Sequence, residues 1–331
     1  MTEITGGNYP WHQPSWQQLS NYIDQQRIPQ ALMISGPKGL GKQQLAYKFA
    51  NALICEQSSI DHQSCGHCKS CQLFKSKNHP DFNVIEPEEA GKKISINPIR
   101  ELISFLSLTS VFSAYRIVII NNADQLTHAA ANSFLKCLEE PSERTVIILI
   151  TDNPALLPAT IISRCQKLKM ACPHSHSAKD WLEQQNITDD LDILLSLSSG
   201  APLTARNYAS TETLALRKKC FHSWLQISQQ KINPVSLAEQ WLQYPESMLL
   251  FWMTTWVIDT IKCYHHQKIQ HFYNPDFSQN LQELAQQLEL KGLFKFYQLL
   301  LKQQNYLLTQ LNKQLIFEEI LINWSQLNRV K

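Results

Sequence analysis

Residues 31–53 decide the fold, and they read Ala31-Leu-Met-Ile-Ser35, then Gly36-Pro-Lys-Gly-Leu-Gly41-Lys42, then Gln43–Leu53. The first segment is an apolar run of strand length, and the last has the apolar spacing of a helix. Between them, the pattern G-x-x-x-x-G-K matches a phosphate-binding loop, in which glycines let backbone N–H groups surround phosphate oxygens. The alternative is an ordinary glycine turn, but the position between strand and helix favours the phosphate loop. Its candidate contacts are Gly36, Gly39, Gly41 and Lys42.

Short apolar runs and helix-like segments alternate from the N-terminus to about residue 166. Besides the first strand, the runs are Phe82–Ile85, Arg116–Ile120 and Thr145–Ile150, and the later helical segments are Ile99–Leu106 and His128–Glu139. Pro141 is expected to stop the last of these helices. Strands that alternate with helices predict a parallel sheet covered on both faces.

The remainder of the chain changes character. After Pro173 the strand signals fade, and from about Tyr208 onward the chain is predicted to be entirely helical. At 331 residues the chain is long enough for two or three domains. We therefore predict a P-loop α/β domain over residues 1–166 with a cysteine module near 55–71, a small helical domain over 167–207 and an all-α domain over 208–331.

Composition excludes several classes of protein. Apolar residues make up 44% of the chain, which is typical of folded globular proteins. The formal net charge is only +2, so global charge gives no reason to expect avid binding to nucleic acid or membrane. The polar start lacks the layout of a secretory signal, and the apolar stretch Met248–Ile258 is too short to span a bilayer. We expect a cytoplasmic protein with no membrane partner.

Two features argue against ATP hydrolysis by the phosphate loop. Gln43 follows the loop lysine, where a working loop places a Ser or Thr hydroxyl on Mg²⁺. The strand Arg116–Ile120 runs into Asn121 and Asn122, where P-loop ATPases carry carboxylates that hold the metal and polarise water. Asp124 lies beyond the strand and is expected to cap or precede the next helix. We therefore do not expect this chain to hydrolyse ATP with Mg²⁺.

Four of the nine cysteines are spaced as a metal site. They follow the pattern C-x9-C-x2-C-x2-C and are Cys55, Cys65, Cys68 and Cys71. Four thiolates at these separations can surround Zn²⁺ tetrahedrally. The alternatives are a disulfide, a redox pair, or His67 in place of one cysteine; cytosolic thiols stay reduced, which disfavours a disulfide. We predict a structural zinc site without an open position for catalysis.

A series of short motifs runs through the first half of the chain. In order they are Tyr9-Pro-Trp11, the Gly36–Lys42 loop, the cysteine cluster followed by His79-Pro-Asp81, Asp124–Asn132, Leu138–Pro141, Thr151–Pro154 and Ser163-Arg164-Cys165. In this order and spacing the chain resembles the delta-prime subunits of the bacterial DNA polymerase III clamp loader, a family of the AAA+ superfamily. The resemblance covers about residues 9–170 and weakens beyond, where Gly200–Leu203 still matches.

The resemblance implies an AAA+ module, a small helical lid domain and a C-terminal collar that closes a ring of subunits. It implies that ATP sites lie between subunits, and that delta-prime itself does not hydrolyse ATP. Ser163, Arg164 and Cys165 then match the motif of an arginine finger, in which Arg164 acts in trans on a neighbouring ATPase. Thr151 matches the first sensor, and Leu203 stands where active relatives carry a second-sensor arginine.

The partners implied by the resemblance are the gamma/tau ATPase subunits and the delta subunit. The sliding clamp and primed DNA would be reached through the complex, at a cytoplasmic, nucleoid-associated replisome. Two other classes stay open. One is an ATPase in its own right, and the other is a zinc-containing DNA-binding module, which the near-neutral charge disfavours. A local ion pair with a carboxylate is the simpler explanation of Arg164.

Overall fold

The structure, a computed structural model, describes residues 9–59, 61–89, 91–107, 110, 112, 115–140, 142–265, 272–306 and 312–327. Pro141, which was expected to stop a helix, lies outside these residues. The chain forms two compact units. Unit 1 comprises Met1–Asp180 and Gly200–Thr204, and unit 2 comprises Trp181–Ser199 and Ala205–Lys331. The division into three domains at residues 166 and 207 stays a prediction.

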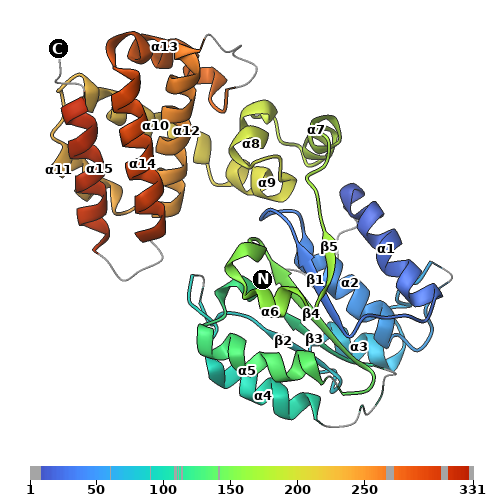
Figure 1. Cartoon of the computed structure of the whole chain (residues 1–331). Helices are drawn as coiled ribbons and strands as arrows, with labels where there is room; N and C mark the ends of the chain where they lie inside the picture. The colour runs from blue at the N-terminus through green and yellow to red at the C-terminus, as the bar shows by residue number, and fades with distance from the viewer. Residues whose placement is uncertain are drawn as a thin grey trace. The chain divides into compact units, whose positions relative to one another are not determined.

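Unit 1 is built on one parallel sheet with strand order β2-β3-β4-β1-β5 (Figure 1). The strands are β1 (Ala31–Ser35), β2 (Phe82–Ile85), β3 (Arg116–Ile120), β4 (Thr145–Thr151) and β5 (Gln166–Lys169). In the register of the central strands, Ile34 of β1 lies opposite Ile150 of β4 and Leu168 of β5. The predicted parallel sheet is therefore confirmed.

Helices cover both faces of the sheet, as the alternation of strands and helices predicted. One face packs against α1 (Gln13–Asp24), α2 (Lys42–Ile54) and α3 (Lys69–Lys75), and the other against α4 (Ile96–Leu106), α5 (His128–Glu139) and α6 (Ala159–Ile162). Successive strand residues alternate between these layers, so Ile34 joins the first and Met33 the second. The central strands β1 and β4 are buried along nearly their whole length, which requires the continuous apolar runs seen in the sequence.

The sequence did not predict β5, because its residues Gln-Lys-Leu-Lys are polar and only Leu168 is buried. An edge strand has one open side, so it needs few apolar residues. Helices α1 and α3 were missed as well. They contain few apolar positions, and α3 is only 7 residues long, too short to show a clear helical spacing.

Unit 2 is entirely helical in its described residues. Its helices are α8 (Leu191–Leu197), α10 (Thr213–Ser228), α11 (Pro234–Trp241), α12 (Glu246–Tyr264), α13 (Ser278–Gln287), α14 (Leu290–Tyr306) and α15 (Lys313–Leu327). Two more, α7 (Ser175–Gln184) and α9 (Pro202–Ser210), span the boundaries between the units. None of the described helices is long and apolar enough to cross a membrane.

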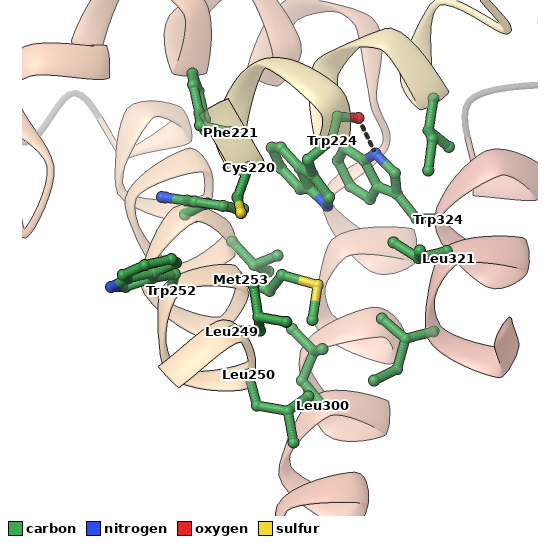
Figure 2. Close-up of a cluster of buried hydrophobic side chains, with 14 of the residues drawn as sticks. Cys220, Phe221, Trp224, Leu249, Leu250, Trp252, Met253, Leu300, Leu321 and Trp324 are labelled. Atoms are coloured by element: carbon green, nitrogen blue, oxygen red, sulfur yellow. Dashed lines mark hydrogen bonds between the residues drawn. The ribbon is translucent and has the colours of Figure 1, made fainter. Parts of the chain in front are cut away.

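Tryptophans dominate the core of unit 2 (Figure 2). Trp224 of α10 and Trp324 of α15 stack with ring centroids 3.9 Å apart, and the Trp324 indole Nε1 donates to the Trp224 carbonyl at 3.1 Å. Trp252 and Trp256 of α12 are fully buried in the same core. Burying such large rings favours folding strongly, so these aromatic residues of the tail belong to the bundle core.

Candidate functional site

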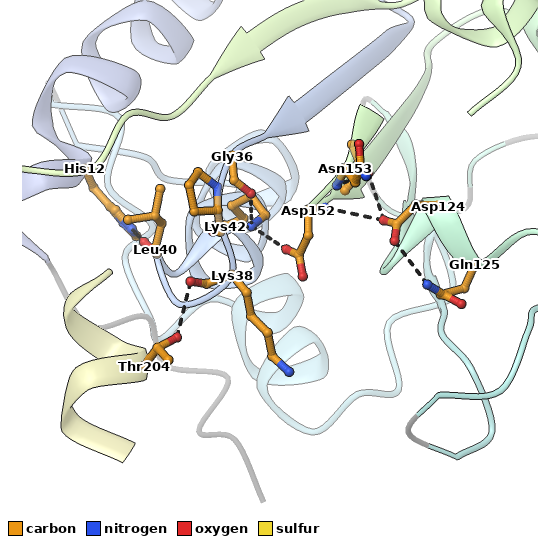
Figure 3. A network of polar contacts seen from close by, with 12 residues as sticks. His12, Gly36, Lys38, Leu40, Lys42, Asp124, Gln125, Asp152, Asn153 and Thr204 are labelled. Carbon is orange, nitrogen blue, oxygen red and sulfur yellow. Dashed lines mark hydrogen bonds and ion pairs between the residues drawn. The ribbon is translucent and has the colours of Figure 1, made fainter. Parts of the chain in front are cut away.

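The phosphate loop leaves β1 at Gly36 and enters α2 at Lys42, as the sequence predicted (Figure 3). Gly39 and Gly41 have φ angles of +86° and +78°, a region that favours glycine. Packing also requires them to be glycine. A Cβ on Gly39 would lie 2.0 Å from Thr204 Oγ1, and one on Gly41 would lie 2.8 Å from the Tyr9 ring.

Neighbouring segments hold the carbonyl groups of this loop. On one side, the Trp11 indole donates to the Leu40 carbonyl at 2.8 Å, and His12 Nε2 contacts the same oxygen at 2.8 Å. Burial lowers the pKa of His12, and a neutral ring protonated on Nε2 suits this contact. On the other side, the Leu203 backbone N–H donates to the Gly39 carbonyl at 3.1 Å. Leu203 therefore touches the loop without bringing a charge.

Lys42 has all its hydrogen-bonding capacity engaged inside unit 1. Its Nζ lies 2.6 Å from the Gly36 carbonyl, 2.7 Å from the Pro37 carbonyl and 2.6 Å from Asp152 Oδ1 (Figure 3). An ammonium group has three N–H donors, and three acceptors surround it. The side chain is only 4% exposed. A phosphate would therefore have to displace at least one of these partners to contact Lys42.

At the end of β3, the carboxylate that comes next in the chain is engaged elsewhere. Asp124 Oδ1 accepts from Thr151 Oγ1 at 2.8 Å and from the Asp152 backbone N–H at 3.3 Å. It precedes α5, as expected, but the cap of that helix is Thr127, whose hydroxyl accepts from a backbone N–H. Asp124 therefore fixes the end of β4. Asn121 and Asn122 directly after β3 carry amides in place of carboxylates.

The four predicted cysteines do come together. The Sγ atoms of Cys55, Cys65, Cys68 and Cys71 all lie within 4.8 Å of one another, and those of Cys65 and Cys71 are 4.0 Å apart. A tetrahedron with Zn–S bonds of about 2.3 Å has S–S edges of about 3.8 Å. The cluster joins the end of α2 to the start of α3, and its donor set could hold a metal ion of this kind.

Backbone N–H groups point at these sulfurs, as thiolate ligands require. Cys65 N–H contacts Cys55 Sγ at 3.3 Å, Cys68 N–H contacts Cys65 Sγ at 3.3 Å and Cys71 N–H contacts Cys68 Sγ at 3.4 Å. The backbone donors at Cys68 and His67 lower the pKa of Cys65 to about 6. The imidazole of His67 contacts the Cys65 carbonyl at 2.8 Å and stands outside the sulfur cluster.

Ser163, Arg164 and Cys165 have three different local roles between α6 and β5. The Ser163 hydroxyl donates to the Thr160 carbonyl at 3.1 Å and closes the short helix α6. Cys165 is buried in the core, which raises its thiol pKa to about 11. Between them, Arg164 points outward with 37% of its side chain exposed. The motif therefore fixes the backbone on both sides of an exposed guanidinium group.

Arg164 and the phosphate loop lie at opposite ends of two neighbouring parallel strands: the loop follows the carboxyl end of β1, and Arg164 precedes the amino end of β5. Strands β1 and β5 run parallel, with Leu32 opposite Gln166 and Ser35 opposite Lys169. Gly36 follows β1, whereas Arg164 precedes β5. The length of β5, about 13 Å at roughly 3.3 Å per residue, separates the two positions. Arg164 therefore lies too far along the strand to serve the phosphate loop of its own chain.

Two residues that matter at these sites were not singled out from the sequence. Asp152 pairs with Lys42, and Glu139 pairs with Arg164 at 2.8 Å. Both occur inside the quoted motifs Thr151–Pro154 and Leu138–Pro141, so the sequence contained them. What was missing was the spatial pairing, because 110 residues separate Lys42 from Asp152 and 25 separate Glu139 from Arg164.

The parallel sheet and the loop after β1 define a P-loop α/β protein with a four-cysteine module and a helical C-terminal unit. Two family models match it: "DNA polymerase III, delta subunit" over residues 11–174 and "DNA polymerase III, delta subunit, C terminal" over residues 211–326. The chain belongs to the family of DNA polymerase III delta' subunits, which confirms the resemblance seen in the motifs.

Individual relatives match nearly the full length. DNA polymerase III subunit delta' of Pseudomonas aeruginosa is 31% identical over 324 residues, covering 96% of this chain and 98% of the relative. Its Escherichia coli K12 counterpart is 30% identical over 325 residues, covering 95% and 94%. A DNA polymerase III gamma subunit-related protein of Thermotoga maritima overlaps 95% of this chain and 99% of its own at 18% identity, with a TM-score of 0.43. At that TM-score the overlap says nothing about function.

Proposed function

We propose that this chain is a non-hydrolysing subunit of a DNA polymerase III clamp loader. It supports assembly of the ring, presents Arg164 to the ATP site of a neighbouring subunit and so helps to load the sliding clamp on primed DNA. Its partners are the gamma/tau ATPase subunits and the delta subunit, and its place is the cytoplasmic replisome on the nucleoid. Family membership supports the complex, and the geometry of unit 1 supports the division of labour.

The phosphate loop supports the non-hydrolysing half of the proposal. Hydrolysis needs a metal held by carboxylate and hydroxyl ligands and a base for the attacking water. The corresponding positions carry the amides of Gln43, Asn121 and Asn122. An amide brings no negative charge to the metal and cannot accept a proton from water. The lysine that would contact the β- and γ-phosphates is held by Asp152 and two loop carbonyls.

The position of Arg164 supports the second part of the proposal, its action on a neighbouring ATP site. A guanidinium group can stabilise the charge that develops on a transferred phosphoryl group, and such fingers are worth about 10³–10⁵ in turnover in GTPases. Arg164 is exposed, its backbone is fixed on both sides, and its own phosphate loop is at the opposite end of the parallel strands. A phosphate that meets this side chain therefore belongs to another subunit.

The test is ATP turnover by a reconstituted loader, stimulated by clamp and primed DNA, in which only this chain carries Arg164→Ala. We expect the site facing Arg164 to slow by about 10³-fold, so that the complex loses that site's share of hydrolysis. Arg164→Lys keeps the charge without the planar fork and should restore little of it. Unchanged turnover in a complex that gel filtration shows to be intact would refute the proposal.

The cysteine cluster is proposed to hold Zn²⁺ in a structural role. Four thiolates fill a tetrahedral shell and leave no open position for substrate, so the metal would cross-link the end of α2 to the start of α3. The N–H donors to three of the sulfurs support thiolate ligands, because they stabilise negative charge on sulfur.

A further inference from the structure

The exposed Arg164 is not free in this chain, because a second helix supplies it with a partner. Its Nη2 lies 2.8 Å from Glu139 Oε1, and its Nη1 donates to the Thr160 carbonyl at 3.0 Å. Glu139 is the last residue of α5, whereas Thr160 belongs to α6. The guanidinium group is therefore held by acceptors from two helices that pack against each other in the sheet's second layer.

These contacts orient the guanidinium group and leave some of its N–H donors available. Arginine has five N–H donors in a planar fork, and two of them are used by Glu139 and Thr160. Donors on both terminal nitrogens and on Nε are left to meet an anion. A helix C-terminus carries partial negative charge, so the end of α5 also favours a cation at this position.

The ion pair is weak enough to adjust when an anion arrives. The side chains of Arg164 and Glu139 are 37% and 49% exposed. Solvent-exposed pairs contribute little to stability, because water screens them and ordering two long side chains costs entropy. Such a pair does little for the stability of the fold, yet it biases the conformations of a long side chain that would otherwise sample many rotamers.

We propose that Glu139 is a positioning residue for Arg164, holding the guanidinium group in the orientation in which it meets the phosphoryl group of the neighbouring subunit. This inference rests on the proposed function of Arg164. It assigns to Glu139 no contact with ATP, so its effect passes entirely through the arginine.

The experiment is a double-mutant cycle in the reconstituted loader, with stimulated ATP turnover as the readout and all changes confined to this chain. Glu139→Ala should lower the part of the turnover that depends on Arg164 by about two- to fivefold, the factor that corresponds to an exposed ion pair, with KM for ATP unchanged. Glu139→Gln keeps an oxygen acceptor for the guanidinium and should restore most of the loss. In the Arg164→Ala background, Glu139→Ala should have no further effect.

Glu140→Ala is the matched control, because Glu140 is an exposed carboxylate at the same helix end that makes no bond to Arg164. It should leave kcat unchanged. The inference is overturned if Glu139→Ala leaves kcat unchanged or raises it, or if it lowers kcat equally with and without Arg164. If Arg164→Ala itself has no effect, the proposed function fails. That result is distinct from one in which Arg164→Ala lowers turnover and Glu139→Ala does not, which overturns only the role of Glu139.

Discussion

Lys42 makes its hydrogen bonds and its ion pair within its own unit. Its three acceptors include Asp152, whose neighbouring Thr151 is held by Asp124. A residue with this burial and this set of partners stabilises the loop as it stands. The loop therefore keeps its shape although Gln43, Asn121 and Asn122 bring none of the charge that a bound Mg²⁺ needs.

The close approach of Thr204 to the loop gives a test of this packing. Gly39→Ala should destabilise unit 1 by about 2 kcal/mol or more, because the new methyl meets the Thr204 backbone as well as its hydroxyl. Gly91→Ala is the control, since Gly91 has the same φ of +86° with nothing within 4 Å of its Cβ position. Urea unfolding of both variants measures the difference, and equal losses of stability would show that backbone strain alone accounts for Gly39.

At this scale the sequence predicted residue types better than contacts. The glycines, Lys42 and the four cysteines were found because each motif is contiguous or closely spaced. Asp152 and Glu139 were not, because an ion pair between distant positions depends on which strand ends and helix ends the fold brings together. No periodicity in the sequence carries that information.

Among the elements, the four-cysteine cluster is the one that the proposed metal ion would hold together. It joins α2 to the short helix α3, and Cys68 serves both as a member of the cluster and as the N-cap of α3. Without a metal, four sulfurs near one another would repel as thiolates or remain as weak thiol contacts. The proposed zinc ion would therefore contribute directly to the folding of this segment.

Removal of the metal gives the corresponding prediction. The purified chain should contain about one equivalent of zinc by elemental analysis, and Cys68→Ser should lower that content and the melting temperature of unit 1. Cys172→Ser, a change of the same kind outside the cluster, should leave the metal content unchanged. A wild-type chain that retains no zinc after purification without chelators would contradict the assignment.

In unit 2, a buried arginine ties α10 to the segment before α13. Arg217 is fully buried, and its guanidinium group donates to both carboxylate oxygens of Asp276 at 2.8 and 2.9 Å and to Asn274 Oδ1 at 2.7 Å. The ring of Phe277 lies 4.2 Å from the same group. A bidentate pair in this setting fixes the geometry of both segments.

Arg217→Ala should therefore cost about 3–5 kcal/mol of stability, because it leaves the Asp276 carboxylate without its partner. Lys218→Ala, at the exposed neighbouring position, should change stability by less than about 0.5 kcal/mol. Denaturant unfolding followed by fluorescence of the core tryptophans measures both. A loss below about 1 kcal/mol for Arg217→Ala would mean that the network contributes little.

For the whole molecule, the alternation of apolar runs and helical segments was sufficient to predict the parallel sheet and the helical C-terminal half. The runs at β1, β2 and β3 coincide with the observed strands because each is a short run rich in apolar residues, buried along most of β1 and β3 and partly buried in β2. The edge strand β5 was missed because burial does not constrain its composition. The topology places the phosphate loop at the carboxyl end of the parallel strands and Arg164 at their amino end.

From that arrangement we propose that this chain contributes Arg164 to a neighbouring ATP site and makes no use of its own phosphate loop. The most direct measurement compares Arg164→Ala with Lys42→Ala, each in this chain alone, in the stimulated ATP turnover of the assembled loader. We expect Arg164→Ala to remove the share of turnover that comes from the facing site and, in complexes of equal assembly, Lys42→Ala to cause no loss. A loss confined to Lys42→Ala would contradict this proposal and make this chain an ATPase in its own right.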